Sequence, residues 1–387
     1  MTLSRNILAA AAAMALAVAG CGDDSDTNAG ASGAAGVGKM TESAAGEVRR
    51  TVETHLKRPD WLGIEGSVAS VPKNQTIAYV FTATPAAAIT SKAAEQAVQA
   101  LGWKIKQHPV KVTPESIQQG FDAALDDPAT DAIISSTVRT SVVKRQLERA
   151  KSKEIPVAIL NPDSDGEDDF VGIGGPDAYT YPGKLEADFI LNQTKGDAQV
   201  LLALPAAYPT IGMLADSFKK EWAEKCPSCK KPLQYQAALT SFGTSFPGLL
   251  TAYLQAHRDV DYIVFGFNDM MIGVPAALKA SGSNDVKAIT WAQGPSTNSL
   301  LGKGLLEAEV GVPVVEFPWV AIDGLLRRLS KQPIDTTREF LGAGHPMHWI
   351  ITKDTMDAAG LDPKKVWPLA PDYAQELRKL WGVDDAR

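Results

Sequence analysis

Two polar residues, Asn268 and Asp269, directly follow the apolar run DYIVFGF. Residues 262–267 are β-branched and aromatic without polar alternation, which is typical of a strand covered on both faces in a parallel sheet. Residues 270–279 predict a helix. The two polar side chains could cap that helix, or they could face the ligand crevice found at the carboxyl ends of strands in open α/β sheets.

A second amide, Gln293, follows the apolar run KAITWA at residues 287–292. Parallel strands end on the same edge of a sheet, so we expect Asn268 and Gln293 to face the same cleft. Each side-chain amide donates and accepts hydrogen bonds. Together they could hold a hydroxyl or carbonyl group without bringing a charge into a dry site.

Cys226 and Cys229 form the CPSC sequence at the end of a predicted helix over residues 213–225. A thiol-oxidoreductase motif usually opens a helix after a strand, where the helix dipole lowers the thiol pKa, and that context is missing here. Zinc would need four ligands, and no second pair of Cys or His stands at a suitable spacing. A structural disulfide, formed outside the cytosol, is the interpretation we favour.

Other groups of residues give only weak evidence for a metal or catalytic site. The NPDSDG stretch has calcium-loop spacing from Asn161, but Gly172 occupies the position that needs a bidentate Glu, so an acidic solvated loop is expected. His345 and His348 lack a third ligand. We find no phosphate loop, nucleophile elbow or zinc-protease motif, so we predict that the chain is not an enzyme and needs no metal or cofactor.

The pattern of the amino terminus predicts an export signal. Arg5 precedes an unbroken apolar segment at residues 7–19, which is too short for a comfortable membrane span. The signal ends in Val18-Ala19-Gly20-Cys21, which resembles the lipobox of bacterial lipoproteins, in which the cysteine receives a lipid. An ordinary cleaved signal with an incidental cysteine is the alternative. The Gly/Ala/Ser/Asp-rich residues after Cys21 then predict a flexible tether.

The remaining chain has the pattern of a two-domain α/β protein. It has 387 residues with 45% hydrophobic and 21% charged residues, and its net charge of −7 argues against a nucleic-acid partner. From residue 76, apolar strand patterns alternate with helical patterns of 10–15 residues. The alternation starts again after Gly174-Gly175-Pro176. Two such runs predict two doubly wound parallel sheets.

Several stretches, in order, resemble the type I periplasmic binding proteins, the ribose-binding-like receptors of ABC importers. The segment HRDVDYIVFGFNDMMIGVPAALKASG is the most specific, supported by TIAYVF, AAEQAVQALGWKI, IPVAILN and KAITWAQGPS. The resemblance covers roughly residues 75–353. It implies two lobes joined by a three-crossing hinge, with a small solute held between them. The expected parts are a signal peptide at 1–20, a tether and extension at 21–72, an N-terminal lobe at 73–175 and 312–333, a C-terminal lobe at 176–311 and 334–353, and a tail at 354–387.

The family resemblance also implies site residues. It assigns Asn268 to the ligand and Asp269 to the helix cap. Charged residues with which the family grips sugars are replaced: Gln293 stands in place of an Asp, and Asn161-Pro162 in place of Asp/Arg. The expected cleft is therefore mostly neutral and lined by Thr84, Ser136, Thr137, Asn161, Tyr208, Phe242, Asn268 and Gln293. Such a lining suits an uncharged solute with fewer hydroxyls than a hexose, with an apolar face for Phe242 or Trp291.

These observations predict a monomeric solute-binding lipoprotein outside the cell membrane, anchored through Cys21. It would capture a small neutral solute, a sugar or a sugar-like molecule, and deliver it to the permease of an ABC importer. A receptor for a membrane sensor would have the same cleft and stays open as an alternative. An exported thiol oxidoreductase using Cys226 and Cys229 is the third possibility.

Overall fold

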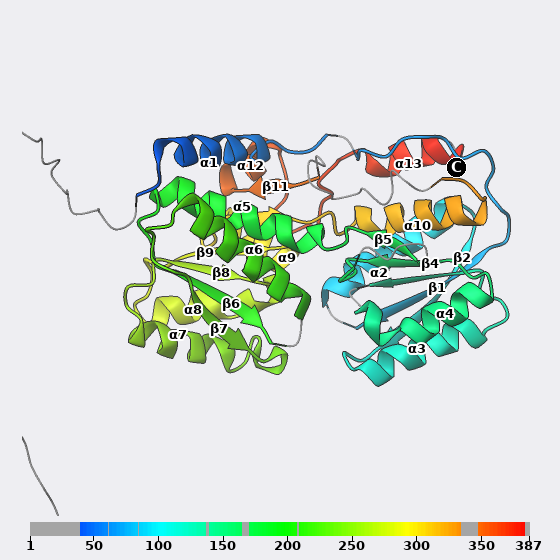
Figure 1. The fold of residues 1–387 in the computed structure, drawn as a ribbon, viewed down its shortest axis with the longest axis horizontal. Coiled ribbons are helices and arrows are strands. Elements are labelled where there is room, and N and C mark those ends of the chain that lie inside the picture. The colour runs from blue at the N-terminus through cyan, green and yellow to red at the C-terminus, as the bar shows by residue number, and fades with distance from the viewer. Residues whose placement is uncertain are drawn as a thin grey trace, which may run out of the picture. The chain divides into compact units, whose positions relative to one another are not determined.

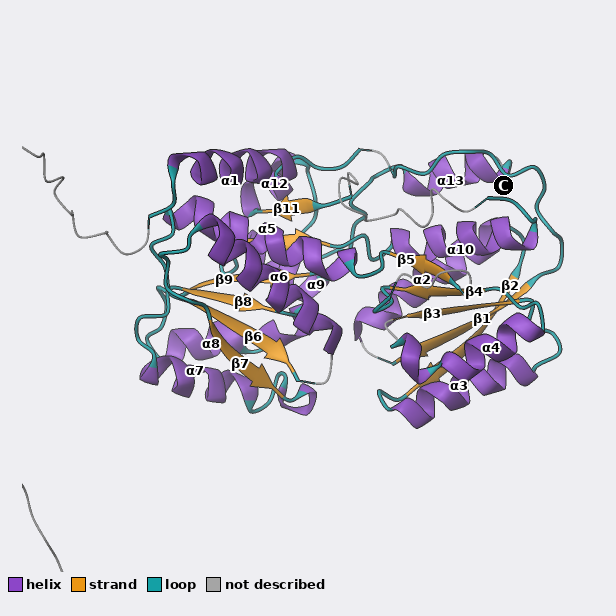
Figure 2. Ribbon diagram, in the orientation of Figure 1, coloured by secondary structure: helices purple, strands orange, loops and turns teal. Residues whose placement is uncertain are grey.

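Two β-sheets organise the part of the chain that the computed structural model describes, namely residues 39–60, 62–83, 85–136, 139–164, 170–206, 209–333 and 347–383 (Figure 1). Each sheet carries helices on its faces, as Figure 2 shows. This arrangement confirms the predicted α/β class with two doubly wound lobes. Among the described residues, no helix is long and apolar enough to cross a membrane.

The N-terminal lobe contains a wholly parallel sheet of order β2-β1-β3-β4-β5. Its strands are β1 Thr76–Thr82, β2 Lys104–Val110, β3 Ala132–Ser136, β4 Val157–Leu160 and β5 Val171–Ile173. Its helices are α2 Pro85–Ala100, α3 Pro114–Asp126, α4 Lys144–Ser152 and α10 Glu316–Leu329, with a 3₁₀ turn at Thr140–Val142. Helices α3 and α4 lie on one face, and α2 and α10 on the other (Figure 1).

Strand β1 shows why this lobe needs helices on both faces. Ala78 and Val80 belong to the hydrophobic core under α3, with Phe121. Ile77 and Tyr79 belong to the core on the opposite side. Because successive side chains of a strand point to opposite faces, the continuous apolar run predicted from the sequence fills two separate cores.

The C-terminal lobe contains a sheet of order β11-β10-β9-β8-β6-β7, in which only the pairing of β10 with β11 is antiparallel. Its strands are β6 Val200–Pro205, β7 Leu233–Ala237, β8 Tyr262–Phe265, β9 Lys287–Trp291, β10 Ala308–Gly311 and β11 Trp349–Ile351. Its helices are α1 Glu42–His55, α5 Asp177–Thr194, α6 Pro209–Lys225, α7 Phe246–Ala256, α8 Val274–Ala280, α9 Pro295–Gly302 and α12 Lys353–Ala358, with 3₁₀ turns at Leu239–Ser241 and Asn268–Met271.

Helices α5 and α6 cross at very close range. A Cβ built at Gly183 of α5 would lie 2.2 Å from the backbone oxygen of Leu214 in α6. Only a residue without a side chain permits this approach. The Sγ atoms of Cys226 and Cys229, just after α6, lie 2.04 Å apart, which is the separation of a disulfide.

The helix expected after Asn268 is shorter than predicted. Asn268–Met271 forms a 3₁₀ turn, Gly273 adopts a left-handed φ of 80°, and α8 begins only at Val274. The cause is Pro275, whose ring would clash with a carbonyl of the preceding turn inside a longer helix and therefore requires a helix start. No side-chain hydrogen bond caps either segment, so the expected capping role of Asp269 is not seen.

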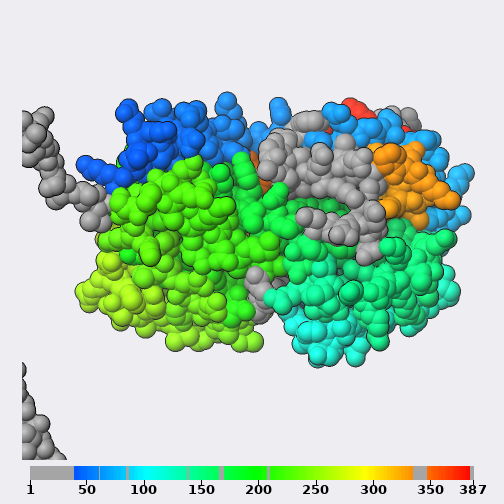
Figure 3. Space-filling view, viewed as in Figure 1, coloured from blue at the N-terminus to red at the C-terminus, as the bar shows by residue number. Residues whose placement is uncertain are grey.

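Two terminal segments run alongside the hinge, between the lobes. The first leaves α1, which packs on α5, and continues over residues 56–60 and 62–72 toward the start of β1. The second leaves α12 and reaches α13 (Tyr373–Trp381), which packs on α10. We call these the terminal straps. Figure 3 shows the first as a blue edge that passes over both halves of the molecule.

The terminal straps are bonded to each other and to α10. Arg58 donates from Nε to the carbonyl oxygen of Leu369 at 3.0 Å, and the N–H of Val68 donates to Leu380 O at 2.7 Å. Glu316 of α10 accepts from the N–H of Leu369 at 2.6 Å. Burial is the largest cause that raises the pKa of Glu316, to about 7, although backbone N–H donors oppose it.

Tryptophan packing also joins the second strap to the N-terminal lobe. The rings of Trp319 in α10 and Trp381 in α13 stack with centroids 5.5 Å apart. The indole N–H of Trp381 donates to the buried carboxylate of Asp323 at 2.8 Å. The strap therefore completes the hydrophobic cover of α10.

Candidate ligand-binding site

A cavity of about 120 Å³ lies where strands of both lobes end. Residues at or just beyond the carboxyl ends of β1, β3 and β4 meet residues that follow β8 and β9, as expected for parallel sheets. Helices α2, α5, α6 and α10 complete the wall. The described lining residues are Thr82, Ala87, Ile89, Thr90, Ser136, Leu160, Asn161, Tyr179, Thr210, Ile211, Phe267, Asn268, Trp291, Ala292, Gln293, Val312, Val314 and Phe317.

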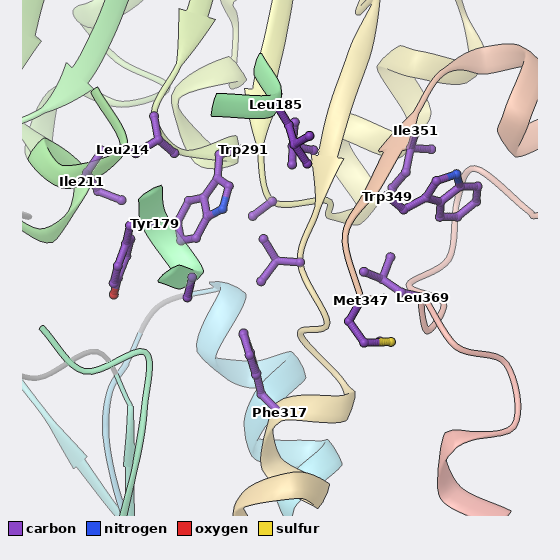
Figure 4. Packing of buried hydrophobic residues seen from close by; sticks show 14 of the residues in the cluster. Tyr179, Leu185, Ile211, Leu214, Trp291, Phe317, Met347, Trp349, Ile351 and Leu369 are labelled. Atoms are coloured by element: carbon purple, nitrogen blue, oxygen red, sulfur yellow. The ribbon is translucent and has the colours of Figure 1, made fainter. Parts of the chain in front are cut away.

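Aromatic rings form much of this wall. Figure 4 shows Trp291 and Tyr179 close together, with Phe317 of α10 on the opposite side. The ring centroids of Tyr179 and Trp291 are 5.6 Å apart. Tyr179 also donates its hydroxyl to the carbonyl oxygen of Asn161 at 2.9 Å, which joins α5 to the end of β4.

Three buried polar atoms of the lining have no hydrogen-bond partner: the Oδ1 atoms of Asn161 and Asn268 and the Nε1 of Trp291. Asn268 and Trp291 are each only 5% exposed. Buried polar groups are normally paired, because an unmade hydrogen bond carries the full cost of desolvation. The side chains of these three lining residues are therefore candidate ligand contacts.

The backbone around these atoms holds them in place. Asn161 has a left-handed φ of 50°, and its N–H donates to Ile173 O at 2.9 Å. A Cβ at Gly294 would lie 2.7 Å from the amide nitrogen of Asn268, so any other residue at this position would displace that side chain.

Gln293 also lines the cavity, but its amide is already engaged. Its Nε2 donates to Val312 O at 2.7 Å, and its Oε1 accepts from Val312 N–H at 2.7 Å. Val312 follows β10 at the crossing toward α10. The side chain therefore ties the end of β9 to the hinge. One amide hydrogen and one lone pair remain for other partners.

The hydroxyl groups on the N-terminal side are likewise occupied. Tyr79 donates to Thr90 Oγ1 at 3.1 Å and shares a hydrogen bond with Ser136. Burial nevertheless raises the pKa of the Tyr79 hydroxyl, and burial also raises the pKa of Tyr179. Both phenols stay neutral at physiological pH. None of the described lining residues carries a charge.

Four of the expected residues meet at the cavity: Ser136, Asn161, Asn268 and Gln293. Thr84, Thr137 and Tyr208 lie outside the described residues. The structure does not bring Phe242 to the cavity. It follows the 3₁₀ turn after the edge strand β7 and packs on Phe246 of α7, with ring centroids 5.8 Å apart.

Sequence reasoning missed Tyr179, Thr210 and Phe317 as lining residues. Tyr179 and Phe317 lie in the first turns of α5 and α10, directly after hinge crossings. A helix that begins at a crossing must begin beside the cleft. That position is the signal that could have identified both residues.

The weaker motifs show no ligand chemistry in the described residues. Asp163 of the NPDSDG loop accepts hydrogen bonds from the backbone N–H and the hydroxyl of Thr140, both at 2.9 Å. His348 is buried, with its ring 4.4 Å from that of Tyr181, whereas His345 is not among the described residues. No group of three His, Cys, Asp or Glu residues in the described part could hold a metal ion.

Solved structures share this fold at low sequence identity. An arabinose-binding protein from Geobacillus stearothermophilus aligns with a TM-score of 0.59 and 14% identity, covering 74% of this chain and 99% of its own. A solute-binding protein from Bacillus halodurans with bound myo-inositol gives 0.62 and 14%, covering 74% and 98%. One from Actinobacillus succinogenes with bound D-allose gives 0.62 and 14%, covering 74% and 100%.

No curated protein sequence matches this chain well enough to count as a relative. The family model described as a periplasmic binding protein domain, however, matches residues 68–332. That range includes both sheets except β11, and all of the described cavity lining. The match also agrees with the two-lobed parallel architecture and with a cavity at the strand ends. The chain therefore belongs to the periplasmic binding protein family, with the type I fold.

Proposed function

We propose that this protein captures a small neutral solute, a sugar or a sugar-like molecule, between its lobes and delivers it to an ABC importer. The observation that carries the proposal is the cavity itself, to which both lobes contribute uncharged polar and aromatic side chains, among them Asn161, Asn268 and Trp291. The structural neighbours that bind arabinose, myo-inositol and D-allose support a ring-shaped neutral solute. The neutral wall supports it too, because a buried ionic ligand would need a charged partner.

The first test is a thermal-shift screen of the exported protein over sugars, polyols, cyclic alcohols and small aromatics. A ligand at 100 times its dissociation constant stabilises the folded state by about 2.7 kcal/mol, so a true ligand is readily seen. Binding should be weakened in Asn268→Ala and retained in Tyr235→Phe, which alters a β7 residue outside the cavity. A screen in which no solute stabilises the protein would contradict solute capture.

Delivery to an importer is tested in cells. Cells that lack this chain should lose uptake of the solute that the screen identifies. Re-expression of the wild-type chain should restore uptake, and Asn268→Ala should not. Normal uptake without the protein would instead favour a sensory role for the same cleft.

We further propose that Cys21 carries the lipid anchor that holds the protein outside the cell membrane. Membrane and soluble fractions of cells that express Cys21→Ala should show release of the protein from the membrane fraction. Unchanged retention of this variant would refute the anchor. The proposed active form is a monomer, which sedimentation with and without solute would check.

A further inference from the structure

Each terminal strap is continuous in sequence with one lobe and docked on the other. The first strap leads into β1 of the N-terminal lobe, and α1 docks it on the C-terminal lobe by packing on α5, with Val48 and Val52 buried. The second strap continues from β11 and α12 of the C-terminal lobe, and α13 docks it on α10 of the N-terminal lobe. The two straps therefore bridge the lobes in opposite directions (Figure 1).

The second strap is tied to both lobes within a few residues. Asn298 of α9, in the C-terminal lobe, donates from Nδ2 to the carbonyl oxygen of Lys365 at 2.8 Å. The N–H of Leu369 donates to Glu316 of α10, in the N-terminal lobe, at 2.6 Å. Only residues 366–368 lie between these two ties. This span has little slack with which to absorb a movement of one lobe against the other.

The first strap is also tied to both lobes. The indole N–H of Trp349 in β11 donates to the carbonyl oxygen of Leu56 at 3.1 Å. On the other lobe, Arg327 of α10 donates from Nη2 to the carbonyl oxygen of Gly66 at 2.6 Å. Arg58 falls between these ties and bonds the first strap to the second. The two straps are therefore joined to each other at the point where they cross from lobe to lobe.

Helix α10 receives both straps and forms part of the cavity wall. Glu316, which holds the second strap, directly precedes the cavity residue Phe317. The stacked rings of Trp319 and Trp381 fix α13 on the same helix. None of the residues in the ties named above belongs to the described lining of the cavity, so the ties form without the help of a solute.

We infer that the terminal straps form a clasp that holds the two lobes close to the arrangement described here before a solute binds. Rotation of one lobe against the other would have to break a tie or undock α1 or α13. A protein whose binding-competent arrangement is more populated binds with a higher apparent affinity, so the clasp favours solute capture. Helices α1 and α13 lie outside residues 68–332, so the clasp is separate from the part of the fold that the family model describes.

Distances between spin labels on the two lobes test the clasp without any solute. The labels would be attached to Gln119→Cys in α3 and Ala252→Cys in α7, at exposed positions in helices that lie away from the straps (Figure 1). The full chain would also carry Cys21→Ala, so that only the introduced thiols react while Cys226 and Cys229 stay bridged. Double electron–electron resonance of this protein should give one narrow distance distribution.

Undocking of α13 should free the lobes. The variant Leu377→Ala/Trp381→Ala removes the buried face of this helix. Its distance distribution should gain a population shifted by more than about 2 Å, the scale of domain rearrangements in other proteins. The control Gln375→Ala/Lys379→Ala changes two exposed residues of the same helix at the same spacing and should match the parent protein. Circular dichroism would verify that both variants fold.

A second variant decides the test if the α13 variant does not fold. Arg58→Gln shortens the side chain that bonds the two straps and leaves the buried apolar residues in place, so it should broaden the distribution in the same direction. A distribution like that of the parent protein, in the α13 variant or, in its place, in Arg58→Gln, would refute the clasp. A broad distribution with both straps intact would refute it too. Neither result depends on a solute, so the proposed function stands or falls separately, by the thermal-shift screen.

Discussion

Replacing Gln293 by alanine is expected to destabilise the unliganded protein, whereas replacing Asn268 is not. Both amides line the same cavity and both are almost fully buried. They differ in their partners. Gln293 makes two hydrogen bonds of 2.7 Å with the backbone of Val312, whereas the side-chain oxygen of Asn268 makes none.

The size of the effect follows from the groups left behind. Gln293→Ala leaves the N–H of Val312 buried without a partner, which costs about 1–3 kcal/mol. The Val312 carbonyl loses one donor, worth about 1 kcal/mol, but keeps its 2.7 Å hydrogen bond from the N–H of Val314. The freed rotamers of an ordered glutamine offset part of this loss. The net loss should be about 1–3 kcal/mol, so at roughly 2 °C per kcal/mol for a chain of this size, Tm should fall by about 2–6 °C.

Asn268→Ala should behave in the opposite way. It removes an unsatisfied buried oxygen, so the unliganded Tm should stay within about 2 °C of wild type, while a ligand that uses this oxygen should bind roughly 5- to 150-fold more weakly. Calorimetric melting with and without the solute found in the screen would measure both effects. If Gln293→Ala melts like wild type but no longer binds the solute, Gln293 is a ligand contact and its assignment as a hinge tie is wrong.

Three further predictions concern the rest of the fold. Gly183→Ala should destabilise the protein by more than about 2 kcal/mol, because its Cβ would overlap a backbone oxygen of α6. Gly212→Ala should instead stabilise it by about 0.5–1 kcal/mol, because Gly212 lies in α6 with open space around it. Similar urea midpoints for the two variants would contradict the close packing of α5 on α6 at Gly183. Burial raises the pKa of Glu309 from 4.5 to about 8, so the folded state binds this proton more tightly than the unfolded state, and the protein loses stability as the pH rises from about 5 to about 8. Glu309→Gln should therefore melt like wild type near pH 5 and at a higher temperature than wild type near pH 8. A difference in Tm that stays constant across this pH range would rule this out. Mass spectrometry of the non-reduced protein should find Cys226 joined to Cys229, and reduction should cost about 2 kcal/mol by loop-closure entropy; free thiols at both positions would show that no bridge forms.

The strands and the position of the candidate cavity could be predicted from the sequence because they depend on local patterns. The run before Asn268 is apolar without alternation, and it becomes the central strand β8 with every residue buried. The rule that parallel strands end on one edge then brings Asn268 and Gln293 to the same cavity.

The hydrogen-bond or packing partner of each side chain could not be predicted from the sequence. Whether Gln293 faces a ligand or the backbone depends on Val312, whose position is set by the path of the hinge. Similarly, Phe242 follows a strand like the other site residues. Its strand β7 lies at the edge of the sheet, and that order is a property of the tertiary fold.

The elements that follow residue 353 were also beyond local patterns and beyond the family resemblance. Helix α13 has its apolar residues on one face, but nothing nearby in the chain indicates what that face covers. In the structure the ring of Trp381 stacks on Trp319 of α10, a helix that covers the N-terminal sheet.

The terminal straps have a consequence for biosynthesis. Arg58 is bonded to the carbonyl of a residue 311 positions later in the chain, and Val68 is bonded to Leu380. At roughly 5–20 residues per second, the ribosome needs about 15–60 s to make the partner of Arg58 after Arg58 itself. The cover of α10 likewise waits for Trp381. A growing chain therefore cannot make these strap contacts until almost its last helix exists, so the tie between the two terminal segments is among the last parts of the fold to form.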